Sequence, residues 1–303
     1  MTQPTATGGA WGAVALCILG VALFSLMDVL MKGASLAMGA FAALFWRNML
    51  ATLFSGAALI AMGSARWPPA AVMRLHWVRA ALIAPMAWLF FWGLTKLPMA
   101  ETIALSFIAP IIALSLTPLL LGEKVSRHAI VAALIGVAGV AIIVGGRIGG
   151  QYQPGALLGA LATLLSAVLF ALNLLVQRRQ AQVAGAIEVA FYQNLLVLAL
   201  LMPFAPWLLR VSAAIQWPEV IGAALLTACS QAALSAAYAK ASASRLIPLE
   251  YSAFLWAALF GWIFFAEMPT VPVLAGVGLI IIACLVAARE RPQLAAHVEA
   301  ESA

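Results

Sequence analysis

WGAVALCILGVALFSLMDVLM, residues 11–31, is an almost unbroken apolar run in which Asp28 is the only charged residue. At about 1.5 Å of rise per residue, a helix of this length crosses the roughly 30 Å of hydrocarbon in a bilayer. Only a helix satisfies its own backbone hydrogen bonds in lipid, so each run of this kind predicts a transmembrane helix. Nine further runs follow at about 39–62, 79–95, 102–121, 129–146, 154–177, 189–209, 219–239, 246–266 and 270–288.

The composition excludes a water-soluble globule. Hydrophobic residues make up 65% of the chain and charged residues 9%, whereas soluble domains carry about 25% charged residues. The 303 residues suffice for ten spans with short loops and leave no sizeable soluble domain. The opening MTQPTATGGAWG lacks the basic segment of a secretory signal, so we expect the first span to be retained.

The net charge of +6 comes from basic residues scattered singly among short loops. A nucleic-acid surface needs such residues on one exposed face, so we interpret them as topology signals and expect no nucleic-acid partner. With the N-terminus inside, eleven basic residues lie in inner loops and the tail and four lie in outer loops. This bias predicts a bacterial-type inner membrane protein with both termini in the cytoplasm. The inner set is Arg66, Arg74, Arg79, Lys124, Arg127, Arg178, Arg179, Lys240, Arg245, Arg289 and Arg291, and the outer set is Lys32, Lys96, Arg147 and Arg210.

Similar residues recur in the two halves of the chain at a nearly constant offset. Lys96 and Lys240 each end an apolar run and are 144 residues apart, as are Glu123 and Glu267. The pairs Arg47 and Gln193, and Asp28 and Asn173, are separated by 146 and 145 residues. The sequence therefore predicts one five-helix repeat over residues 1–148, a second over 149–290, and a cytoplasmic tail over 291–303.

An odd number of helices per repeat makes the second copy enter the membrane from the opposite side. Inverted repeats of this kind are frequent in secondary transporters, because two related halves give two equivalent states that open to opposite sides. We therefore expect an all-α membrane protein that works by alternating access.

Two five-helix repeats, each with a Lys at a helix end and a Gly/Ala–Glu about 27 residues later, resemble the EamA-type drug/metabolite transporters. The resemblance covers residues 11–288, and within the superfamily the chain is most similar to bacterial aromatic amino acid exporters. It implies packing or gating roles for Glu123 and Glu267. The second copy departs from the first after Glu267, where Met268 and Pro269 replace Lys124 and Val125.

Three ionisable residues lie within the predicted spans, where their high cost makes them functional candidates. Arg47, the only basic residue in this set, offers a planar fork for a substrate carboxylate, and a tie to Asp28 or to backbone carbonyls is an equal alternative. Asp28 is either a ligand or a structural partner of Arg47. Glu250 is either an acceptor for a proton or a substrate amino group, or an interfacial carboxylate that reaches the membrane surface.

Aromatic and neutral polar residues near these three complete the predicted substrate site. A mostly apolar and aromatic pocket with a few polar groups suits an amphipathic metabolite. The alternatives are lipid-facing aromatic side chains and hydrogen bonds between helices. The aromatic candidates are Trp46, Trp88, Trp92, Tyr192, Tyr251 and Trp256, and the neutral polar candidates are Asn48, Ser106, Asn173 and Gln193.

Two functional classes remain. We favour a secondary transporter that exports small amphipathic metabolites, with amino acids, aromatic ones included, as the preferred substrates. Nucleosides, sulfonium compounds and drugs stay open as substrates, and proton coupling stays open as the driving force. A lipid-modifying membrane enzyme is disfavoured, because none of the three histidines has a catalytic or metal-binding partner at suitable spacing. Cys17, Cys229 and Cys284 lie far apart in apolar runs, so no metal or other cofactor is expected.

Overall fold

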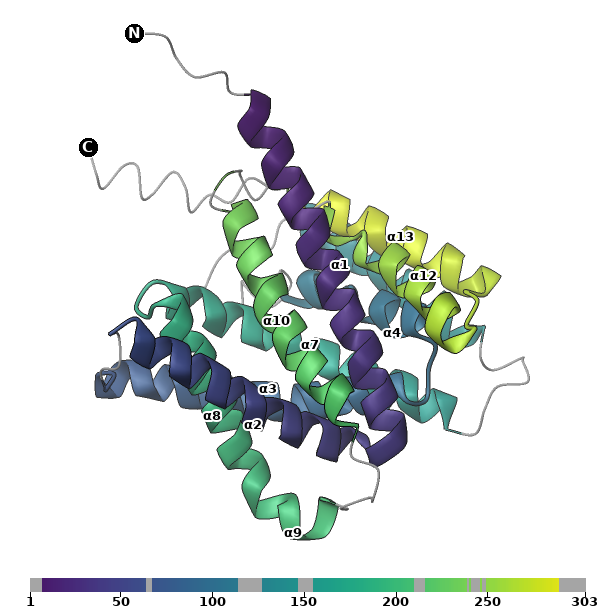
Figure 1. The fold of residues 1–303 in the computed structure, drawn as a ribbon. Coiled ribbons are helices and arrows are strands. Elements are labelled where there is room, and N and C mark those ends of the chain that lie inside the picture. The colour runs from purple at the N-terminus through teal and green to yellow at the C-terminus, as the bar shows by residue number, and fades with distance from the viewer. Residues whose placement is uncertain are drawn as a thin grey trace, which may run out of the picture.

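The computed structural model describes residues 7–63, 67–113, 127–146, 155–209, 216–238, 240, 246 and 249–288. Within these ranges all regular secondary structure is helical (Figure 1). The helices of the first half are α1 (Thr7–Met38), α2 (Ala40–Ala61), α3 (Ala70–Leu94), α4 (Met99–Ser106) and α6 (Arg127–Gly145). Those of the second half are α7 (Ala156–Ala181), α8 (Ala186–Leu201), η1 (Met202–Phe204), α9 (Ala205–Leu208), α10 (Trp217–Tyr238), α12 (Ala253–Phe265) and α13 (Val271–Ala288).

Six described segments are long and apolar enough to cross a membrane. Four shorter apolar helices, at Met99–Ala113, Ile130–Gly145, Ala253–Phe265 and Val271–Val286, lie where four other spans were predicted. The all-helical membrane architecture is thus confirmed, and the count of ten spans stays a prediction.

Some boundaries differ from the predicted runs because helices continue through charged residues. α1 extends to Met38 and therefore includes Lys32, which was assigned to an outer loop. α3 begins at Ala70, so that Arg74 and Arg79, assigned to an inner loop, are helical residues. Hydropathy alone ends a run at the first charge, but these helices continue through Lys32 and Arg79, which have partners in other segments, and through Arg74, which is exposed.

A single glycine separates α1 from α2. Gly39 has φ of 89° and ψ of 147°, a backbone conformation that residues with side chains rarely adopt. This tight turn reverses the chain and lets α1 and α2 pack against each other. The two helices that carry Asp28 and Arg47 are thereby held side by side.

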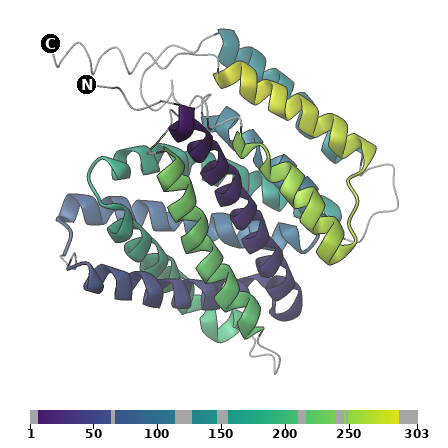
Figure 2. The same ribbon diagram turned by 45° about the horizontal axis from the view of Figure 1, so that its top comes forward.

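The helices associate mainly in pairs that join the two halves. The pairs are α1 with α10, α3 with α7, α2 with α8, α4 with α12, and α6 with α13, and Figures 1 and 2 both show α1 lying along α10. In the five-plus-five arrangement, the counterparts of α1, α2, α3, α4 and α6 are α7, α8, α10, α12 and α13. Exchanging each helix for its counterpart turns the α1–α10 pair into the α7–α3 pair and leaves the other three pairs unchanged. Two copies related by a two-fold axis would give this pattern.

Two serine hydrogen bonds show that α1–α10 and α3–α7 also share a register. Ser230 Oγ on α10 donates to the carbonyl of Gly20 on α1 at 2.8 Å. Ser166 Oγ on α7 donates to the carbonyl of Met86 on α3, also at 2.8 Å. Met86 and Ser230 are 144 residues apart and Gly20 and Ser166 are 146 apart, so the two bonds join equivalent levels of the two pairs.

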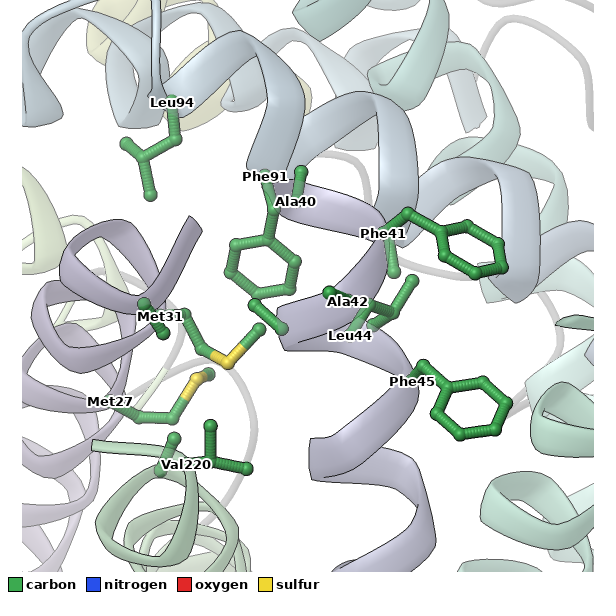
Figure 3. Close-up of a cluster of buried hydrophobic side chains, with 14 of the residues drawn as sticks. Met27, Met31, Ala40, Phe41, Ala42, Leu44, Phe45, Phe91, Leu94 and Val220 are labelled. Atoms are coloured by element: carbon green, nitrogen blue, oxygen red, sulfur yellow. The ribbon is translucent and has the colours of Figure 1, made fainter. Parts of the chain in front are cut away.

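The interior between α1, α2, α3 and α10 is filled by one apolar cluster. Figure 3 shows the ring of Phe91 from α3 between α1, which carries Met27 and Met31, and α2, with Val220 of α10 beside Met27. Large apolar side chains on the outer faces, such as Leu134 and Trp262, are exposed, as expected where a lipid bilayer replaces water.

Candidate functional site

Asp28 lies on α1 inside this apolar cluster. It is 1% exposed, next to Met27. Among the residues that the structure describes, no hydrogen-bond donor reaches either carboxylate oxygen. A buried polar group without a partner costs free energy, and a charge in a membrane interior costs more. The position of Asp28 is therefore hard to explain by stability and favours a role in binding.

Arg47 on α2 lies at the same level of the bundle in a similarly apolar setting. Its guanidinium carbon is 5.8 Å from the centroid of the Phe91 ring, and Nη1 is 3.8 Å from Met27 Sδ. Within the described ranges, Nε has no hydrogen-bond partner and the guanidinium forms no ion pair with Asp28. A cation–π contact compensates only part of the cost of burying a guanidinium. Arg47 thus retains hydrogen-bonding capacity that the described part of the protein does not use.

The residues on either side of Arg47 differ in what they contact. Trp46 packs edge-on against Trp217 of α10 with ring centroids 5.3 Å apart, so it connects α2 to the second half. Asn48 is buried and donates to the carbonyl of Leu44 in its own helix at 2.7 Å. Trp46 is an aromatic residue adjacent to Arg47 in the chain. Asn48 uses a side-chain N–H for a hydrogen bond within its own helix.

The other predicted aromatic residues do not gather around Arg47. Trp88 is 38% exposed and contacts Phe41 edge-on, while Lys96 lies over the ring of Trp92 at 5.9 Å. Tyr251 precedes α12 and contacts Phe107 at 5.3 Å.

The remaining candidates lie on several different elements of the structure. Trp256 on α12 packs against Phe260, at 5.7 Å, and against the small cluster around Cys17. Glu250 and Gln193 are partly buried. Ser106 donates to the carbonyl of Thr102 in its own helix at 2.9 Å. Glu123 lies outside the described residues.

A polar network that the sequence did not indicate joins α3, α7 and α8. Arg79 donates through Nε to Asn173 Oδ1 at 3.1 Å and through Nη1 to Gln180 Oε1 at 2.6 Å. Gln180 Nε2 is 2.7 Å from His76 Nδ1, and His76 Nε2 is 3.2 Å from Glu188 Oε1. Arg79 and His76 are both buried. Arg79 is therefore a buried arginine within a helix, which corrects its placement in a loop, and Asn173 accepts a hydrogen bond from it.

Tyr192, another predicted site residue, borders this network. It is buried, and its ring centroid is 4.9 Å from that of His76. The spacing of these polar residues along their helices is compatible with the network, although it was not used to predict it. His76 and Arg79 are three residues apart and Asn173 and Gln180 are seven apart, so each pair lies on one face of its helix.

Lys32 forms a third polar contact at the ends of α1, α4 and α12. Its ammonium donates to the carbonyl of Leu97 at 2.9 Å and pairs with the carboxylate of Glu267. Glu267 Oε2 also accepts the backbone N–H of Met99, the first residue of α4, at 2.8 Å. Lys32 is 3% exposed, so Arg47 is not the sole basic residue within the helices. Lys32 and Arg79 donate hydrogen bonds to protein oxygens. Arg47 differs from them, because its Nε has no hydrogen-bond partner among the described residues.

Comparison with known proteins bears on this arrangement. The model of the EamA-like transporter family matches residues 11–145 and again residues 157–289. The chain belongs to the EamA-like transporter family. As an EamA-like protein it is a multi-pass membrane transporter.

Several curated EamA-like relatives match most of this chain. A pseudopaline exporter of Pseudomonas aeruginosa is 27% identical over 92% of this chain and 96% of its own length. Riboflavin transporters of Rhizobium johnstonii and Brucella anthropi are 29% and 27% identical over 90% and 81% of this chain, and 89% and 87% of their own lengths. A crystal structure at 19% identity aligns with a TM-score of 0.61 over 91% of this chain and 96% of that chain, which supports the fold. None of these names specifies an aromatic amino acid exporter.

Proposed function

We propose that this EamA-like protein is a secondary exporter of small amphipathic metabolites, with amino acids, aromatic ones included, as favoured substrates. The observation that carries the proposal is the pair Asp28 and Arg47. Each is placed in an apolar cluster by one of two adjoining helices, and among the described residues neither forms a direct ion pair, although the two charges interact through space. A zwitterionic solute would supply a direct hydrogen-bonding partner of opposite charge to each side chain.

The surroundings of Arg47 support an amphipathic solute. A guanidinium binds a carboxylate through two parallel hydrogen bonds, which fixes the orientation of the ligand. Phe91 and Trp46 offer aromatic surfaces beside it, against which the apolar part of a metabolite can pack. The named relatives include an exporter and transporters of small molecules, which agrees with this class of solute.

Alternating access between two inverted five-helix halves is the transport mechanism that we propose. Support comes from the two separate matches of the family model and from a helix pairing that is preserved when the halves are exchanged. Because α1 and α2 belong to the first half and α10 to the second, relative motion of the halves would alter the surroundings of Asp28.

Transport by purified protein in proteoliposomes tests the function. We expect counterflow of labelled phenylalanine, tyrosine or leucine, and a lower apparent affinity in Arg47→Lys by about 10-fold or more. An ammonium keeps the charge but cannot reproduce the two-point contact with a carboxylate, a contact worth about 1.5–3 kcal/mol. Repeating the assay with and without a pH gradient shows whether protons drive transport.

The matched control is Arg74→Lys, an exposed arginine on α3, which should transport as the wild type does. Absence of transport for every amino acid would reject this substrate class and direct the panel to nucleosides, sulfonium compounds and drugs. Equal affinities of the wild type and Arg47→Lys would remove Arg47 from the site.

Topology is tested independently with reporter fusions. A reporter fused after Ala288 should report the cytoplasm, and one inserted in the turn at 145–150 should report the opposite side, because five predicted helices separate the two points. Gly145 and Gly146 fall within the described residues of that turn, and residues 147–150 lie outside them. Finding both reporters on one side of the membrane would reject the five-plus-five inverted arrangement.

A further inference from the structure

We propose that Asp28 binds a positively charged amine of the transported solute. At the level of Asp28, α10 has no cationic side chain, whereas α3 supplies one at the equivalent level of the α3–α7 pair. The inference rests on the proposed transport function and adds the chemical group that the transporter recognises. It is argued from a comparison of the α1–α10 pair with the α3–α7 pair.

The two pairs have the same register along their length, so equivalent levels can be compared. Ser230 to Gly20 in one pair and Ser166 to Met86 in the other join equivalent levels. In a third contact, a Cβ added to Gly222 on α10 would lie 2.7 Å from Leu30 Cδ1 on α1, which places these residues together two positions beyond Asp28. Asp28 is thus level with the segment of α10 around Ala223.

At this level, the α3–α7 pair has a complete polar contact. Arg79 on α3 donates to Asn173 on α7 at 3.1 Å. Asn173 and Asp28 are offset by 145, within one position of the offset of 146 that the serine bonds give for these helices, and Arg79 corresponds to Ala223 at an offset of 144. The pair with a neutral amide on one helix has an arginine on the other, whereas the pair with a carboxylate has a methyl group at that position.

Nothing else in the described part of α10 substitutes for the missing cation. His76, the other basic member of the α3 network, corresponds to Val220, and both Val220 and Ala223 are fully buried. Figure 3 shows Val220 beside Met27, the residue before Asp28. Asp28 is therefore level with apolar residues of α10, which offers no cation there.

An ammonium group suits this carboxylate better than a metal ion does. Divalent ions require several oxygen ligands, and the described residues contain no group of three or more His, Cys, Asp or Glu side chains placed to hold a metal. A primary amine needs one charged acceptor and forms short, strong hydrogen bonds to it. Arg47 on the adjoining helix offers the complementary contact for a carboxylate on the same solute.

The test uses three compounds of matched shape as competitors of labelled phenylalanine in proteoliposomes: phenylalanine itself, phenethylamine, which lacks the carboxylate, and 3-phenylpropionate, which lacks the amine. In the wild type, phenylalanine should compete at least about 10-fold better than either phenethylamine or 3-phenylpropionate, because each of the two lacks one charged contact, to Arg47 or to Asp28. Asp28→Asn should weaken the two amines by about 10- to 100-fold, the loss expected for one charge-assisted hydrogen bond, and leave 3-phenylpropionate unchanged.

Two further variants separate binding from structural effects. Asp28→Glu keeps the charge and should retain the preference for amines. Ser230→Ala removes a polar contact from the same helix pair and should leave the ranking of the three compounds unaltered. Asp28→Asn also removes the negative charge that interacts through space with the Arg47 guanidinium, so thermal unfolding of each variant is measured beside the ranking.

The outcomes are distinguishable. If the wild type transports phenylalanine but ranks the three compounds equally, or if Asp28→Asn keeps the wild-type ranking, the amine subsite is refuted while the transport function stands. If Asp28→Asn changes only the dependence on the pH gradient, Asp28 carries a proton and the amine subsite is likewise overturned. If no member of the wider metabolite panel is transported by the wild type, the proposed function fails and the subsite fails with it.

Discussion

Replacing Glu267 with glutamine is expected to destabilise the protein by about 3 kcal/mol, as measured by thermal unfolding in detergent or lipid. The substitution keeps the shape of the side chain and an oxygen that can accept the N–H of Met99, but it removes the negative charge opposite Lys32. The ammonium of Lys32 is almost fully buried, and a buried charge that loses its partner typically costs about 3–5 kcal/mol.

A double variant shows whether the charge itself is responsible. Lys32→Met combined with Glu267→Gln leaves no buried unpaired charge, so it should be more stable than Glu267→Gln alone. Lys96→Met serves as the control at an exposed lysine near the same helix ends, where we expect a loss of about 1 kcal/mol or less. If the double variant is as unstable as Glu267→Gln, the ion pair does not account for the stability of this helix junction.

Arg79→Met is expected to reduce stability by about 2–6 kcal/mol. The methionine fills much of the volume of the arginine stem but leaves Asn173 Oδ1 and Gln180 Oε1 without the donors that Arg79 provides. Each buried acceptor that loses its partner costs about 1–3 kcal/mol. Thermal unfolding of the purified protein gives the measurement.

Arg74→Met on the same helix provides the comparison, because Arg74 is exposed and its loss should change stability by no more than about 0.5 kcal/mol. The variant Arg79→Lys should be intermediate, since an ammonium reaches one of the two acceptors but not both in the geometry of a guanidinium. Equal stabilities of Arg79→Met and Arg74→Met would show that the α3–α7–α8 network contributes little.

Apolar runs were informative about where helices lie, since burying a polar backbone in lipid without helical hydrogen bonds is prohibitive. They were less informative about where helices end. The run at 11–31 stopped at Lys32 and the run at 79–95 started at Arg79, but α1 continues to Met38 and α3 begins at Ala70. In each case the charged residue is compensated by groups that are distant in the chain, as Lys32 is by Glu267, 235 residues away and just after α12.

The predicted site residues were chosen by type and by position within a run, and the structure gives them different surroundings. Asn173, a candidate hydrogen-bond donor for substrate, accepts a hydrogen bond from Arg79. Trp88 lies at an exposed face. Asp28 and Arg47, by contrast, keep unused hydrogen-bonding capacity among the described residues.

By itself, the sequence determined the class of protein, its all-helical fold and its candidate intramembrane charges, because these depend on local composition and on helix length relative to bilayer thickness. Its near-constant offset between similar residues also predicted two related halves. Only the tertiary structure decided which charges are neutralised, because the partners of Lys32 and Arg79 come from segments that are distant in the chain. The same packing places Asp28 level with apolar residues of α10, and this long-range difference between two similar helix pairs distinguishes a candidate ligand from a structural contact.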